Sequence, residues 1–234
     1  MPKPNGNAPT RKQGRPRRVD RSQIIAVAKS LDPSRLTMQA IADELGVDRK
    51  TINYHVTDRD GLLRLVASDV FESHFQAAFR GEHGSREPGT ELPWTEMTRR
   101  WAIAVRDSVV VSGTPTHYYR IGGADTAMFE PVEEVLQSML RAGFDRLTAS
   151  RGLVFLTRFA MGVGRDIVME SSIGEHPQSP EVRRAFEADD SDRFEAFRWM
   201  MDNDLNGPSD IEEQFLFELD VYMAGMAKRL APIV

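Results

Sequence analysis

Residues 36–71, "LTMQAIADELGVDRKTINYHVTDRDGLLRLVASDVF", hold two short helical patterns separated by a glycine bend. Thr37 suits the N-cap of a helix whose inner face is apolar, and Gly46 suits its left-handed C-terminus. Asp48 can cap a second short helix over residues 49–55. Two short helices joined by a three-residue turn containing glycine are typical of a helix-turn-helix motif.

The helix over residues 49–55 has an unusually polar outer face. Ile52 is expected to face Ile41 of the preceding helix, which leaves outward Arg49, Lys50, Asn53 and Tyr54. The second helix of a helix-turn-helix enters the major groove, where Arg and Lys pair with guanine and Asn with adenine. Thr51, Tyr54 and His55 are better suited to phosphate contacts. The alternative is a solvated polar helix, which would favour Glu and Lys over Asn-Tyr-His.

The helix-turn-helix is expected to form part of a three-helix domain over residues 20–66. Asp20 and Gln23 form a plausible capping pair before an apolar helix that Pro33 ends. Asp58 can begin a fourth helix that extends towards Phe79 and crosses the domain boundary.

Residues 1–19 form a basic arm with six Lys and Arg side chains and no acid. The whole chain has a net charge of −5, so the other 215 residues sum to −11. This asymmetry is typical of a DNA-binding arm. A disordered, solubilising tail is the alternative, because Pro, Gly and Asn in this stretch favour disorder.

Composition limits the remaining choices. The chain has 234 residues and no cysteine, which excludes disulfides, thiolate metal sites and cysteine nucleophiles. No apolar run approaches a membrane span and the N-terminus does not resemble a secretory signal, so we expect a cytoplasmic protein with no membrane partner.

Helical periodicity without a persistent strand pattern predicts an all-α fold. Beyond the N-terminal domain, helices are expected near 94–111, 125–142, 145–171, 181–204 and 210–230. Residues 67–234 are therefore expected to form a larger helical domain. The helices over 145–171 and 210–230 are apolar on more than one face, which predicts either a thick core or a homodimer interface.

The quoted stretch resembles the DNA-binding domain of the tetracycline-repressor (TetR-like) transcriptional regulators. Residues 20–75 carry the likeness, through Thr37, Ala42, Leu45-Gly46-Val47, Thr51, Tyr54-His55 and Leu62-Leu63. The resemblance implies a ligand-responsive regulator, most often a repressor, that binds a palindromic operator as a dimer and is released by a small-molecule effector. It further implies that residues 67–234 are the effector-binding and dimerisation domain, in which the dimer would form through a four-helix bundle of the two apolar helices from each subunit.

The resemblance also implies roles for individual residues. The predicted DNA-binding set is Thr37, Gln39, Arg49, Lys50, Thr51, Asn53, Tyr54, His55 and Arg59, with Arg15, Arg17 and Arg18 of the arm. Asn53 departs from the family, which often has Tyr at this place, so the base preference does not carry over.

The middle helices are expected to hold the effector. The predicted ligand-binding set is His74, Trp101, His117, Tyr118, Met128, Phe155, Arg158 and Phe159, although core packing is the alternative for each aromatic. Arg158 and Arg165 lie seven residues apart on one side of a helix, where they could supply polar contacts to the effector. Ion pairs with Asp166 or other acids are an equal alternative for both arginines.

No metal or other cofactor is expected. His117 falls where tetracycline-responsive members carry a metal-binding His, but Phe75 stands where another His belongs, so a magnesium–tetracycline site is not predicted. No catalytic constellation is found, so we do not expect an enzyme. The remaining alternative is a helical small-molecule carrier or enzyme with an incidental helix-turn-helix.

Overall fold

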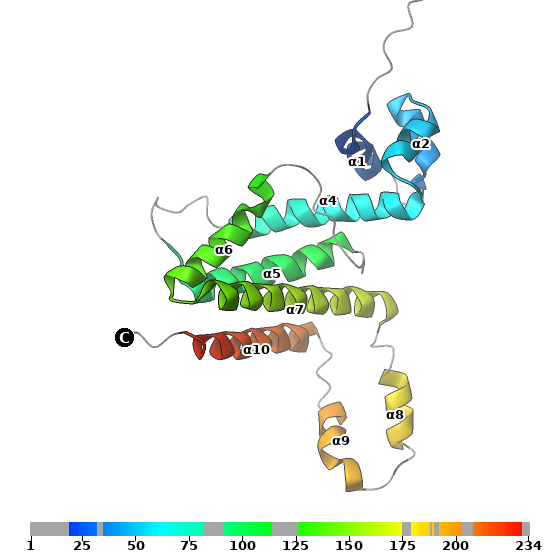
Figure 1. The fold of residues 1–234 in the computed structure, drawn as a ribbon. Helices are drawn as coiled ribbons and strands as arrows, with labels where there is room; N and C mark the ends of the chain where they lie inside the picture. Colours follow the sequence, from blue (N-terminus) through cyan, green and yellow to red (C-terminus); the bar gives the residue numbers. More distant parts are fainter. Residues whose placement is uncertain are drawn as a thin grey trace, which may run out of the picture. The chain divides into compact units, whose positions relative to one another are not determined.

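The computed structural model describes residues 19–31, 35–81, 91–113, 126–174, 179–187, 189, 192–202 and 208–230. All regular structure in these ranges is helical, which confirms the predicted all-α class (Figure 1). The N-terminal helices are α1 (Arg21–Ser30), α2 (Met38–Leu45), α3 (Arg49–His55) and α4 (Arg59–Arg80). They are followed by α5 (Trp94–Ser112), η3 (Thr126–Phe129), α6 (Glu130–Arg141), α7 (Arg146–Ile173), α8 (Ser179–Glu187), η4 (Asp192–Phe194), α9 (Glu195–Asp202) and α10 (Pro208–Ala227).

The chain divides into two compact units, Met1–Val66 and Ala67–Val234. The division falls inside α4, so one continuous helix contributes to both units. Each unit has its own apolar core.

The first unit begins at a capping box. The Asp20 side chain accepts a hydrogen bond from the backbone N–H of Gln23 at 2.9 Å, and the Gln23 side chain accepts one from the Asp20 N–H at 3.2 Å. These reciprocal bonds satisfy donors that a helix start would otherwise leave unpaired. The core beneath α1, α2 and α3 contains Ile24, Ile41, Ile52 and Leu62, all completely buried.

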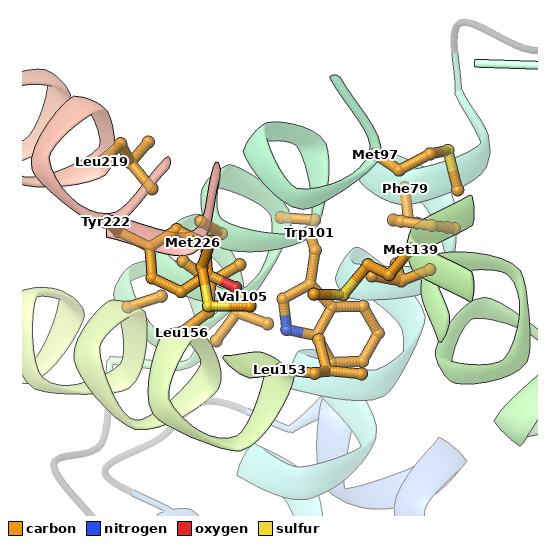
Figure 2. Packing of buried hydrophobic residues seen from close by; sticks show 14 of the residues in the cluster. Phe79, Met97, Trp101, Val105, Met139, Leu153, Leu156, Leu219, Tyr222 and Met226 are labelled. Atoms are coloured by element: carbon orange, nitrogen blue, oxygen red, sulfur yellow. The ribbon is translucent and has the colours of Figure 1, made fainter. Parts of the chain in front are cut away.

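The second unit is built around α5 and α7, which pack along each other. Helices α6 and α10 also pack against α7 (Figure 1). The core between them holds Trp101, Met139, Leu153 and Leu156, and Figure 2 shows the Trp101 indole beside Met139 and Leu153.

The structure corrects the expected helix over residues 181–204. Helix α8 ends at Glu187, and helical structure resumes with η4 at Asp192 and continues into α9. The intervening sequence is rich in Asp and Ser, whose side chains compete for backbone hydrogen bonds and favour helix ends. The two short helices pack through Phe186, whose ring stacks on Phe197 with centroids 4.8 Å apart.

Candidate functional site

The bend between α2 and α3 depends on one glycine. Gly46 has φ of 66°, and its N–H donates to the carbonyls of Ala42 and Asp43. The Val47 N–H donates to the Ala42 carbonyl at 2.9 Å, which completes the cap. A Cβ at Gly46 would meet nothing within 4 Å, so the backbone conformation, and not lack of space, favours glycine.

Helix α3 is fixed from below by a single apolar residue. Ile52 is completely buried in the same cluster as Ile41. The Asp48 side chain accepts from the Lys50 N–H at 2.7 Å and so caps the helix start. The seven-residue helix therefore has a defined inner side, and its other side chains are oriented by that anchor.

The outer side of α3 carries the predicted base-contacting residues. Arg49, Lys50, Asn53 and Tyr54 are exposed, and Tyr54 is 88% exposed. Thr51 and His55 are half-buried, and the Tyr54 and His55 rings meet edge to face at 5.4 Å. The outer side of α3 thus exposes two cations, a carboxamide and an aromatic hydroxyl to solvent. We call these four exposed residues the α3 face.

Three other predicted DNA-binding residues take part in bonds within the first unit. Thr37 caps α2 by accepting from the Ala40 N–H at 3.1 Å. The Gln39 carboxamide donates to Asp43 at 2.7 Å, and Arg59 Nε donates to the Leu36 carbonyl at 3.3 Å. Arg15, Arg17 and Arg18 lie outside the described residues.

Trp101, predicted to bind ligand, lies in the core of the second unit. It is 6% exposed, and its ring meets Phe75 and Phe79 edge to face. The indole N–H donates to the Thr157 hydroxyl at 2.9 Å, which itself donates to the Leu153 carbonyl. Phe75, which stands where the resemblance expects a His, is part of this aromatic packing.

His74 and Met128 are linked to neighbouring helices through polar contacts. His74 Nδ1 lies 3.1 Å from the Ser108 hydroxyl on α5. Ser108 is completely buried, and no feature of the surrounding sequence singles it out. The Met128 carbonyl accepts from the Gln76 side chain at 3.3 Å, which ties η3 to α4.

The aromatic residues predicted on α7 face α10. Phe155 stacks on Tyr222 with centroids 5.9 Å apart, and Phe159 stacks on Phe215 at 5.6 Å. Phe155 is nevertheless 60% exposed, and Arg158 is exposed too. Phe155 and Phe159, both in the predicted ligand-binding set, line a hollow between α7 and α10. His117 and Tyr118 lie outside the described residues.

The open surface of α7 and α10 is strongly apolar. Its exposed large side chains include Phe155, Phe217 and Val221. A hollow of about 750 Å³ lies between the two helices, with Arg151, Glu218 and Arg229 among its polar lining residues. Burial raises the pKa of Tyr222, which also lines the hollow, to about 12. We call this surface the α7–α10 face.

One buried cation joins α5 to α10. Arg106 is 8% exposed and lies 4.2 Å above the Phe215 ring. Its guanidinium donates to Asp107 at 2.8 Å and to Glu212 at 2.5 Å. Both acids are partly solvated, so the arrangement neutralises a charge that would otherwise be costly to bury.

Two other site types find no support among the described residues. They contain no group of three or more His, Cys, Asp or Glu side chains placed to hold a metal ion. None of their helices is both long and apolar enough to cross a membrane.

No protein-family model matches the chain. Solved structures do match over nearly its whole length. A TetR transcriptional regulator from Streptomyces coelicolor, SCO7222, is 19% identical with a TM-score of 0.60, and the match covers 91% of this chain and 100% of that one. The chain has the TetR fold. The fold implied by the sequence resemblance is therefore confirmed.

Two further proteins with the TetR fold were solved with small molecules bound. The S. coelicolor TetR family protein ActR, in complex with actinorhodin, is 16% identical with a TM-score of 0.56, covering 92% of this chain and 99% of that one. A TetR variant from Acinetobacter baumannii AYE, in complex with minocycline, is 14% identical with a TM-score of 0.57, covering 91% and 99%.

Proposed function

We propose that this chain is a ligand-responsive transcriptional regulator that binds a palindromic DNA operator as a homodimer and acts as a repressor. The α3 face carries this proposal. A seven-residue helix anchored by one buried isoleucine directs Arg49, Lys50, Asn53 and Tyr54 outward. A helix surface that only contacts water does not require this combination of hydrogen-bond donors and an aromatic ring.

The side chains of the α3 face match the chemistry of the major groove. Arg49 and Lys50 suit guanine O6 and N7, and Asn53 suits adenine N6 and N7. Tyr54 and His55 suit phosphate contacts that position the helix. Thr37, Gln39 and Arg59 already hold bonds within the unit, so we assign them to orienting the helices and to secondary contacts with the DNA backbone.

The α7–α10 face supports dimerisation. Exposed aromatic and aliphatic side chains gather there on two neighbouring helices, and such a patch marks an interaction surface. A second copy related by a twofold axis would cover the same patch on both subunits. Two copies would then present two α3 faces to the half-sites of one palindrome.

The second unit is proposed to bind the effector. Support comes from the ligand complexes of ActR and of the Acinetobacter TetR variant, which have the same fold. Helix α4 belongs to both units, so a ligand that favours another arrangement of this helix would change the spacing of the two α3 faces. Release requires only that the ligand bind the non-matching state better than the matching one.

The test is binding of the purified chain to a labelled DNA fragment from beside its own gene. The double variant Lys50→Ala/Asn53→Ala is expected to lose discrimination between this fragment and random DNA. The control variant Lys29→Ala removes an exposed cation from α1 and is expected to discriminate between the two DNAs as the wild type does. Unchanged discrimination in the double variant would remove the α3 face from the proposal.

A further inference from the structure

Arg165 on α7 has an unusual environment. Its side chain is partly buried, and its Nε is shielded from solvent without a hydrogen-bond partner. Within the described ranges it forms no ion pair, and this includes the adjacent Asp166. A buried donor left unpaired costs free energy, so such a group in a native protein calls for an explanation.

Two independent contacts bring α7, at Gly164, and α4, at His74, against the same turn of α5. Gly164, the residue before Arg165, packs so closely that a Cβ there would lie 2.8 Å from the Arg106 carbonyl oxygen. From α4, His74 Nδ1 reaches the hydroxyl of Ser108 in the same turn. The turn of α7 that precedes Arg165 and the His74 side chain of α4 therefore both contact residues 106–109 of α5.

The hydrogen bonds of Ser108 determine what His74 can offer. The Ser108 hydroxyl donates to the Ala104 carbonyl at 2.5 Å, so its oxygen accepts from His74 Nδ1–H. This leaves His74 Nε2 as an acceptor when the ring is neutral and as a donor when it is protonated.

We propose that the effector carries a planar oxyanion, of which a carboxylate is the simplest case, bound side-on by Arg165 Nε and a terminal nitrogen. His74 Nε2 supplies a second polar contact. The planar fork of arginine matches a carboxylate through two parallel hydrogen bonds. This inference rests on the proposed function, because it assigns the ligand class of the same effector site.

The neighbouring cations explain why Arg165 is the residue assigned. Arg106, at the same turn of α5, is already paired with Asp107 and Glu212. Arg158, two turns earlier on α7, is exposed to solvent. Arg165 alone of these three combines a shielded donor with an unpaired charge.

The first experiment needs no ligand. Arg165→Met keeps most of the packing of the side chain and removes the charge, so the melting temperature of the ligand-free protein is expected to rise by about 2–4 °C. Arg146→Met, at an exposed position on the same helix, serves as the matched control and is expected to leave the melting temperature unchanged. A fall in Arg165→Met would reveal a structural ion pair and overturn the proposal.

The second experiment tests the ligand class by calorimetry. The probes are aromatic carboxylates and their primary amides, with 1-naphthoate and 1-naphthamide as the first pair. At least one acid is expected to bind about tenfold or more tightly than its amide, and Arg165→Gln to abolish that difference. Arg165→Lys should restore part of this difference, and the control Arg146→Gln should retain it in full.

Three results would overturn the proposal: equal affinity of acids and amides, unchanged acid binding in Arg165→Gln, or no binding by any acid. A DNA-binding assay of ligand-free Arg165→Gln distinguishes failure of the proposed ligand class from failure of the proposed function. The variant is expected to bind DNA like the wild type. If neither protein binds DNA, the proposed function fails, whatever the probes do.

Discussion

Two glycines on α7 are expected to change the stability of the protein in opposite directions when each is replaced by alanine. At Gly164, a Cβ would lie 2.8 Å from both the Arg106 carbonyl oxygen and the Val109 Cβ. At Gly162, two residues earlier, a Cβ would meet nothing within 4 Å. Both residues lie inside the helix, where Ala is favoured over Gly by about 0.8–1 kcal/mol.

The expected stabilities follow from these distances. Gly162→Ala should gain about 1 kcal/mol, which raises the melting temperature by about 2–4 °C. Gly164→Ala gains the same helix propensity but forces α5 and α7 apart, because a backbone carbonyl cannot rotate away. Overpacking costs about 1–3 kcal/mol, so after the gain of about 1 kcal/mol in helix propensity we expect a net loss of up to about 2 kcal/mol.

The assay is calorimetric and urea unfolding of both variants and the wild type at one protein concentration. The expected order of stability is Gly162→Ala, wild type, Gly164→Ala. If Gly164→Ala were as stable as Gly162→Ala, the close approach of α5 and α7 would be refuted, and with it the placement of Arg165 beside α5.

The remaining predictions concern the bend, the apolar face and one buried hydroxyl. Gly46→Val forces a β-branched residue to φ of 66° and should destabilise the first unit by about 1–2 kcal/mol, measured by urea unfolding, with weaker DNA binding as a result. Phe155→Glu on the α7–α10 face should shift the protein from dimer to monomer in sedimentation equilibrium; Val111→Glu, at an exposed position on α5, should not, and a persistent Phe155→Glu dimer would exclude that face. Tyr222 has a folded-state pKa of about 12, above its ordinary value of 10, so its contribution to stability is complete below about pH 10 and is lost as the pH rises towards 12. Tyr222→Phe should flatten the alkaline decline in unfolding free energy over that range, and an unchanged decline would contradict the assigned pKa.

The sequence predicted the first unit well because its signals are local. Asp20, Thr37 and Asp48 each accept hydrogen bonds from N–H groups two or three residues away, and Gly46 ends α2 through its own φ. Ile52 faces inward because of helical spacing alone. Such features depend on neighbours within one turn, so they can be read from one short stretch.

The second unit was harder to predict because its sites depend on contacts between distant residues. Nothing in the sequence indicates that Ser108 bonds His74, or that Arg106 is neutralised by Glu212 at the start of α10. Phe155 and Phe159 are both aromatic and lie one turn apart, yet one is exposed and the other half-buried. Periodicity identifies an apolar helix but does not say which side another helix will cover.

Ala160 and Gly164 lie four residues apart on α7, and their small size lets another helix approach closely. In the structure, Gly164 receives α5 of the same subunit. The end of α8 at Glu187 was not predicted, although the Asp and Ser residues that follow it favour a helix end.

The central claim, that the α3 face reads base edges in the major groove, is tested most directly by chemical protection of guanine N7. Dimethyl sulfate modifies this atom from the major groove, and the DNA beside the gene for this chain is the substrate. The account predicts two protected half-sites with their centres about one helical turn or a multiple of it apart, and loss of both in Lys50→Ala/Asn53→Ala. Protection that persists in the double variant, or no protected guanine in a fragment that the wild type demonstrably binds, would contradict it.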